Sequence, residues 1–182
     1  MNYSQQYSRL LELSERRHES IQNLIFYLET QTNWLTAPAS KSNHLNCEGG
    51  LWHHSINVAT TLITIRDALN ITYTYQACML VGLFHDVGKI GLSREKDMFL
   101  KRENGIYASN HSLPFLDVPT RSIYLLAKFV DLEEDEIQAI RYHDGSNLPF
   151  NYGVAGKECG LTLALQFADH WCATVVERDN DE

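Results

Sequence analysis

The segment from Tyr73 to Val87 most restricts the fold, because it is almost entirely apolar and yet ends in a histidine and an aspartate. Its composition predicts a helix that is buried on most sides and that stops at Gly88. A His85-Asp86 pair at the end of such a helix is costly if left unpaired, since desolvating a carboxylate costs several kcal/mol. A divalent cation would satisfy the pair. The alternative is a bond to the backbone or to Lys89, and the dipeptide alone does not separate the two.

Apolar residues at helical spacing predict further helices around this one. The first region has a mostly polar centre, so it is either one long helix or two short ones. Asn70 closes the 51–69 helix, and Pro119 opens the 119–129 helix. Asp131 with Glu134 resembles a capping box at the start of the 131–142 helix. The last helix ends in an acidic segment that we expect to be frayed. These regions are residues 4–30, 51–69, 119–129, 131–142 and 161–178.

A different pattern separates these helices between residues 97 and 110. Short apolar runs flank Asn104-Gly105, and Asn-Gly is a strong signal for a tight β-hairpin turn. We therefore expect an all-α helical bundle with a small inserted hairpin. The length predicts a single domain spanning 1–182, with an N-terminal helical extension at 1–45 and a core at 49–173.

Composition restricts the location and the partners. The net charge of −8 argues against broad coating of nucleic acid, although a bound metal could still attract a small phosphorylated substrate. The four cysteines are scattered without a C-x-x-C pair, which is typical of a reduced cytoplasmic protein. Neither a secretory signal nor an apolar run long enough to span a membrane is visible in the sequence, so we expect no membrane association.

Two other apolar helices each carry one metal-binding side chain. His54 lies near the start of the 51–69 helix, after Gly49-Gly50, and Asp169 lies within the 161–178 helix. Together with His85 and Asp86 they would supply two imidazoles and two carboxylates from three helices. Such a set suits Mn, Fe, Mg or Zn better than a thiophilic metal.

The order of these residues resembles the HD-domain superfamily, in which a histidine, an HD pair and a distant aspartate follow one another. The flanking residues agree over residues 49–173: Gly-Gly-Leu-x-x-His-Ser ending at Ser55, Leu-x-His-Asp-x-Gly-Lys ending at Lys89, and Leu-x-x-Ala-Asp ending at Asp169. The resemblance implies a core of about five helices enclosing the metal site. It also implies phosphohydrolase activity on nucleotides or phosphodiesters, with one or two divalent ions (Mn, Fe, Mg, Zn or Ni) per chain.

Two further histidines fit the binuclear branch of that superfamily. The candidate ligands alternate in spacing, 31 (85−54), 26 (111−85), 32 (143−111) and 26 (169−143) residues apart. By resemblance, Asp86 would bridge two metals, the second of which is held by His111 and His143. His111 could instead be a surface histidine, and both could contact substrate phosphate in a single-metal site. Many relatives have a histidine where this chain has Asp144, so the roles of Asp144 and of His53 stay open.

Asp86 and Lys89 are the catalytic candidates. Lys89 would neutralise charge on a phosphoryl group that metal-activated water attacks. Alternatively, Lys89 is a solvated lysine without a catalytic role, stabilised by the dipole at the end of its helix. Two other functions use the same ligands: a di-iron oxygenase and a non-catalytic nucleotide sensor. The expected partner is a small phosphorylated molecule such as a nucleotide; an oligonucleotide and a homo-oligomer are both allowed.

Overall fold

The structure is a computed structural model that describes residues 2–92 and 97–178. Over these ranges it is a bundle of helices with one two-stranded antiparallel sheet, which confirms the expected mostly-α fold with a small hairpin. None of the described helices combines the length and the apolarity needed to cross a membrane. The elements are α1 (Tyr3–Leu11), α2 (His18–Gln31), α3 (Gly50–Ala68), α4 (Tyr75–Phe84), β1 (Phe99–Lys101), β2 (Tyr107–Ser109), α5 (Val118–Leu126), α6 (Glu134–Tyr142) and α7 (Gly160–Trp171).

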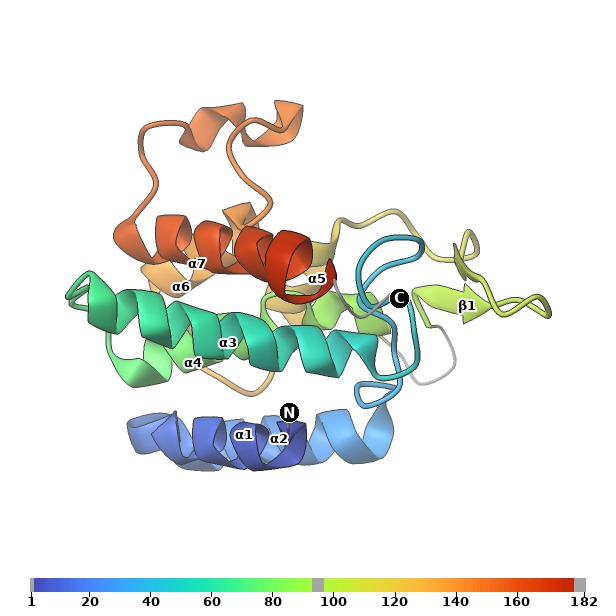
Figure 1. Cartoon of the computed structure of the whole chain (residues 1–182), viewed down its shortest axis with the longest axis horizontal. Coiled ribbons are helices and arrows are strands. Elements are labelled where there is room, and N and C mark those ends of the chain that lie inside the picture. Colours follow the sequence, from blue (N-terminus) through green and yellow to red (C-terminus); the bar gives the residue numbers. More distant parts are fainter. Residues whose placement is uncertain (1, 93–96, 179–182) are drawn as a thin grey trace.

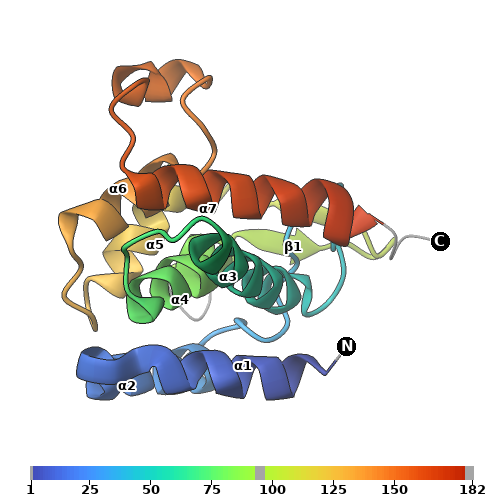
Figure 2. The same cartoon turned by 60° about the vertical axis from the view of Figure 1, so that its left-hand side comes forward.

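The N-terminal region forms two helices rather than one. The polar stretch between them is a 3-10 segment, Glu12–Arg17, in which Glu15 has a positive φ of 40° that breaks the helix. α1 and α2 lie together as a layer beneath α3 and α4 (Figures 1 and 2). The layer packs through residues such as Ile21, Leu24 and Leu28, which are fully buried.

α4 is the central helix, and every residue of it from Gln76 to Phe84 is buried. It packs most extensively on α3, where a Cβ added at Gly82 would lie only 2.5 Å from Ala59 Cα, so this position requires glycine. The helix ends at Phe84, earlier than the predicted Val87, and a 3-10 turn, Val87–Ile90, follows. The chain turns here because Gly88 fits tightly against α5, with its backbone N–H donating to Ser122 Oγ.

The hairpin forms where Asn104-Gly105 predicted it. Leu100 pairs with Ala108 in the register, and Gly105 takes the positive φ of 82° that the turn needs. The hairpin lies at one end of the bundle, beside the loop that joins α2 to α3 (Figure 1).

The predicted start of α6 needs correction. The capping box is made by Glu133 and Glu136 instead of Asp131 and Glu134, so the helix begins at Glu134. The reason is that Arg17 binds both the Asp131 carbonyl and the Glu136 carboxylate, which holds Asp131 outside the helix. Between α6 and α7 the chain makes an excursion, residues 145–159, that contains an unpredicted 3-10 segment, Pro149–Val154.

Candidate metal centre

His54 enters the centre from the second turn of α3. The helix is preceded by Gly49 in a left-handed conformation (φ 78°), and Gly50 contacts the Leu45 carbonyl so closely that a Cβ there would collide with it. This tight entry fixes the first turn of α3 and therefore the direction of the His54 side chain, which is buried.

His85 and Asp86 lie in the turn after α4. Both are buried, at 0% and 4% exposure, so the chain places an imidazole and a carboxylate where water cannot solvate them. Lys89, in the same turn, pairs with Asp86 Oδ2. The 3-10 turn Val87–Ile90 brings the Lys89 ammonium to this carboxylate.

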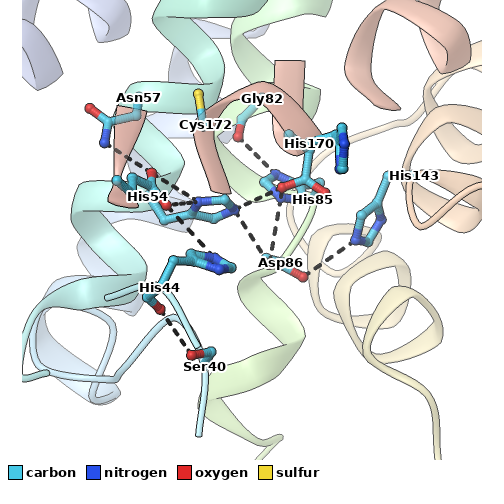
Figure 3. Close-up of polar contacts among 12 residues, drawn as sticks. Ser40, His44, His54, Asn57, Gly82, His85, Asp86, His143, His170 and Cys172 are labelled. Atoms are coloured by element: carbon cyan, nitrogen blue, oxygen red, sulfur yellow. Dashed lines mark hydrogen bonds and ion pairs between the residues drawn. The ribbon is translucent and has the colours of Figure 1, made fainter. Parts of the chain in front are cut away.

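Two more helices complete the cluster. His143 caps the C-terminus of α6, with Nε2 3.5 Å from Asp86 Oδ1. Asp169 lies on α7, with Oδ1 3.0 Å from His54 Nε2 and 3.8 Å from His85 Nε2. His54 and His85 also approach Asp86 Oδ2, at 3.8 and 3.6 Å. Figure 3 shows the three histidine rings gathered around Asp86.

Each of the three rings is held through Nδ1, so that Nε2 faces the others. His85 Nδ1 lies 3.0 Å from the Gly82 carbonyl, and His143 Nδ1 lies 2.8 Å from the Ile140 carbonyl. A carbonyl only accepts, so both Nδ1 atoms carry a proton, and in the neutral form of either ring Nε2 presents a lone pair. Bonds of this kind orient metal-ligating histidines in proteins.

The third ring, His54, is held by a residue that the sequence did not predict. Its Nδ1 lies 3.1 and 3.0 Å from Oε1 and Oε2 of Glu177, which is fully buried, and Asn57 Nδ2 donates to Glu177 Oε1 at 2.9 Å. Glu177 follows a π-helical turn, Cys172–Val176, that prolongs α7. Its position in an acidic C-terminal stretch gave no signal for a buried role. Only the spacing of eight residues from Asp169, about two helical turns, could have suggested one.

His44 is a second residue that the sequence analysis left without a role. It lies in the loop before α3, with its ring centroid 4.9 Å from that of His54 and Nε2 3.7 Å from Glu177 Oε2. The loop is closed by a bond from Ala39 N–H to the Leu45 carbonyl and by one from Ser40 Oγ to the His44 carbonyl. Loop closure therefore places His44 beside the centre, as Figure 3 shows.

The electrostatics of the centre divide the histidines into two kinds. Burial lowers the pKa of His85 to about 4, which keeps this ring neutral. Burial acts the same way on His54 and His143, but bonds to Asp169 and Glu177 raise the pKa of His54 to about 10. The bond to Asp86 likewise raises the pKa of His143 to about 9.

The carboxylates shift in the opposite direction. Burial alone would raise the pKa of Asp86, but Lys89 and the nearby histidines hold it well below its usual value. Asp169 and Glu177 are likewise lowered, chiefly by their bonds to His54, which outweigh burial. At neutral pH three carboxylates (Asp86, Asp169 and Glu177) thus face three cations (His54, His143 and Lys89).

The residues fit a divalent cation on two observations. The Nε2 atom of His85 is buried and has no hydrogen-bond partner, an expensive state for a ring nitrogen unless a ligand uses it. Imidazole and carboxylate groups from α3, α6, α7 and the turn after α4 also come within ligand distance of one another. These buried His/Asp groups could therefore hold a metal ion.

Comparison of the chain with protein families, with curated protein sequences and with solved structures gives no match. The assignment of a function therefore rests on the residues of the centre.

Five of the six predicted ligands meet in this centre: His54, His85, Asp86, His143 and Asp169. The sixth, His111, is exposed in the turn after β2 and forms no ion pair with Asp86 or Asp169 in the described part of the chain. Its role as a ligand stays a prediction, and one that requires the segment after the hairpin to move inward.

Asp144 and His53, whose roles the sequence left open, differ in their surroundings. Asp144 lies at the rim, half exposed, with Oδ1 3.5 Å from His143 Nε2. His53 stacks on Tyr3 of α1, with ring centroids 4.2 Å apart, so it packs against the N-terminal layer. Of the two, Asp144 is the one that lies beside a candidate ligand.

Proposed function

We propose that this chain is a metal-dependent phosphohydrolase of the HD-domain type that acts on a nucleotide or another phosphoester. The observation that carries the proposal is the convergence of three histidine Nε2 atoms on Asp86 and Asp169, with the Nε2 of His85 buried and unpaired. Three imidazoles and two carboxylates with an open side are a donor set that hydrolytic metal centres use. The HD-like order of these ligands in the sequence supports the same class.

The open side of the centre lies at Asp169 and Lys89. Their side chains are 22% and 16% exposed, whereas those of His54, His85 and Asp86 are at most 5% exposed. A phosphorylated substrate would therefore approach over Asp169 and Lys89. His54 and His85, sealed from water, would serve to hold the cation.

The residues would divide the work as follows. When bound, a divalent cation supplies Lewis-acid polarisation of a phosphoryl oxygen and lowers the pKa of a water molecule. His54, His85, His143, Asp86 and Asp169 would hold it. Lys89 would place a positive charge where negative charge develops on the phosphoryl oxygens, while its bond to Asp86 orients that carboxylate.

The test combines metal analysis with an activity screen. Protein purified without chelator is analysed for bound metal, and nucleotides and phosphodiesters are then offered with added Mn²⁺. We expect at least one divalent ion per chain and release of phosphate or a nucleotide from one substrate class. Oxygen consumption by iron-loaded protein without phosphoester turnover would favour the oxygenase alternative. Nucleotide binding without either reaction would favour the sensor.

A further inference from the structure

His44 lies beside the centre without being one of its candidate ligands. It belongs to the loop between α2 and α3, and its ring lies next to that of His54, with centroids 4.9 Å apart (Figure 3). Its Nε2 atom is 3.7 Å from Glu177 Oε2, too far for a hydrogen bond, and forms no ion pair with Asp86 or Asp169 in the described ranges. The imidazole of His44 therefore stands just outside the ligand set.

The backbone around His44 is strained and tightly held. Leu45, the next residue, has a positive φ of 45°, a conformation that residues other than glycine rarely adopt. Its carbonyl accepts a bond from Ala39 N–H and packs against Gly50, and its side chain is buried. Such conformations persist only where the surrounding structure holds them, and they concentrate at functional sites. The loop therefore fixes where the His44 ring lies.

Two histidines at the centre have a buried ring nitrogen without a hydrogen-bond partner among the described residues. They are His85 and His44, and in both the atom is Nε2. In the neutral ring of His85 this atom carries a lone pair, since Nδ1 donates to the Gly82 carbonyl, and a cation would satisfy it. In His44 the nearby Glu177 carboxylate favours the tautomer with the proton on Nε2, so this atom is a donor that lacks an acceptor. An anionic oxygen would satisfy it.

His44 also belongs to the open side of the centre. Its side chain is 17% exposed, between the 22% of Asp169 and the 16% of Lys89. Burial lowers the pKa of His44, and the charges of His54 and Lys89 lower it further, whereas those of Glu177 and Asp169 raise it. Because Lys89 and Asp169 both act on the ring, a molecule that approaches over these two residues also meets His44.

We propose that His44 is a substrate-binding residue, whose imidazole N–H donates to an oxygen of the phosphoryl group that the centre holds. The identity of this ligand rests on the proposed phosphohydrolase function. The cation and Lys89 would each attract one oxygen of the phosphoryl group, and His44 would bind a further one. The two unpartnered nitrogens of the centre then have opposite roles, since His85 binds the cation and His44 binds the anion.

The first test measures the binding of inorganic phosphate to the Mn²⁺-loaded protein by phosphorus-31 relaxation, because Mn²⁺ relaxes a phosphate at the centre much faster than one bound elsewhere. His44→Ala should raise the dissociation constant for phosphate by about 10–100-fold, as expected for the loss of one hydrogen bond to a charged group. His44→Gln keeps an N–H donor and should lose less. His18→Ala is the matched control, because it removes an exposed histidine of α2 and should leave phosphate binding unchanged.

Titration calorimetry with Mn²⁺ separates a contact with the substrate from a role in holding the cation. If His44 only helped Glu177 to orient His54, its removal would lower the affinity for Mn²⁺. We expect His44→Ala to bind Mn²⁺ as tightly as wild type does. Weaker Mn²⁺ binding together with unchanged phosphate binding would overturn the inference and make His44 a positioning residue.

A second measurement needs no substitution. In wild type loaded with Zn²⁺, which is diamagnetic, nitrogen-15 NMR should show that Nε2 of His44 carries the proton. Addition of phosphate should shift the resonance of this nitrogen and leave those of His18 in place. A proton on Nδ1 alone, or a His44 resonance that phosphate does not shift, would contradict the inference.

The outcomes also separate this inference from the proposed function. If phosphate binds through His44 but wild type hydrolyses no phosphoester, the phosphohydrolase activity is refuted and the anion contact stands without it. If a phosphoester is hydrolysed with the same kcat and KM by wild type and by His44→Ala, the activity stands and the role of His44 is refuted. Mn²⁺-loaded wild type that binds no phosphate would refute that role as well.

Discussion

Both carboxylate oxygens of Glu177 lie within 3.1 Å of His54 Nδ1, although the two residues are 123 positions apart in the chain. Because a carboxylate only accepts, the bond places the proton on Nδ1 and turns Nε2 toward Asp169. Glu177 is thus built as a positioning residue for a metal ligand.

We expect Glu177→Ala to lower the affinity for Mn²⁺ by about 10–100-fold, the usual effect of losing an outer partner of a ligating histidine. Glu177→Gln keeps an acceptor for Nδ1 and should lose less. Glu134→Gln, which removes an exposed carboxylate from α6, should have no effect. Isothermal titration gives the affinities, and nitrogen-15 NMR of the His54 ring reports the tautomer. Equal affinities for Glu177→Ala and wild type would show that Glu177 has only a structural role.

Asp86→Ala should abolish cation binding and with it any activity, because Asp86 is the carboxylate that His54, His85 and His143 all approach. The substitution also leaves Lys89 without its partner, so the apo protein should lose about 3 kcal/mol of stability. Asp144→Ala removes a nearby but half-exposed carboxylate and should keep the cation. Metal analysis and thermal unfolding provide the readouts. Undiminished metal content in Asp86→Ala would refute the centre as assigned.

Cation binding should release protons in a pH-dependent way. Near pH 7 the rings of His54 (pKa about 10) and His143 (pKa about 9) carry protons that a cation must displace from Nε2, whereas His85 (pKa about 4) has none to lose. We therefore expect two protons to be released per cation at pH 7, and affinity should rise with pH until the release disappears above about pH 10. Titration calorimetry in buffers of different ionisation enthalpy counts these protons. His143→Ala should reduce the count to one.

The same pKa shifts set the stability of the apo protein. The folded-state pKa values of His54 and His143 lie above the ordinary value of 6.5, so their stabilising contribution is complete below pH 6.5. It is lost as pH rises through about 9 and 10. The free energy of unfolding of the apo protein, prepared with a chelator, should thus fall across this alkaline range. Addition of the cation should suppress this fall. A stability that is flat from pH 7 to pH 10 in the apo protein would contradict these assignments.

Lys89→Ala should retain the cation and lose turnover. Removal of one group that stabilises transition-state charge costs about 3 kcal/mol, or 10²–10³ in kcat. Lys157→Ala removes an exposed lysine of the excursion and serves as the control. Steady-state kinetics on the phosphoester found in the screen, together with metal analysis, separate the two effects. Wild-type kcat/KM in Lys89→Ala would leave Lys89 as an ordinary partner of Asp86.

His143 and His111 should differ in their effect on metal content. His143 lies in the centre, so His143→Ala should weaken cation binding, whereas His111 is exposed and His111→Ala should leave binding unchanged. Anomalous scattering from Mn-soaked crystals then counts the ions. Two peaks about 4 Å apart, with the second one lost in His111→Ala, would show that the segment after the hairpin closes over a binuclear site.

The sequence could predict the parts of the fold and of the centre that depend on local patterns. The apolar 73–87 segment identified the buried helix, and its terminal His85-Asp86 pair identified the centre. Asn104-Gly105 identified the hairpin because its turn chemistry is local. These features are encoded within a few residues of where they act.

The rest depended on tertiary contacts. The start of α6 is set by Arg17, which lies 119 residues before Glu136. Glu177 reaches His54 through a π-helical turn, and His44 reaches it through a closed loop. No sequence pattern predicts the course of the chain in either segment. His111, which regular spacing along the chain suggested as a ligand, is exposed in the turn after β2, and its role stays a prediction.

The π-helical turn at Cys172–Val176 makes this region sensitive to changes in chain length rather than in side-chain identity. Such turns hold one residue more than an α-helical turn. Deletion of exposed Thr174 would remove this additional residue, so the turn could relax to an α-helix with Glu177 still facing His54. Insertion of one more residue would instead rotate Glu177 by about 100° about the helix axis, away from His54. Substitution of the same threonine should be tolerated. An insertion, which surface positions usually accept, would here separate Glu177 from the buried histidine that it holds.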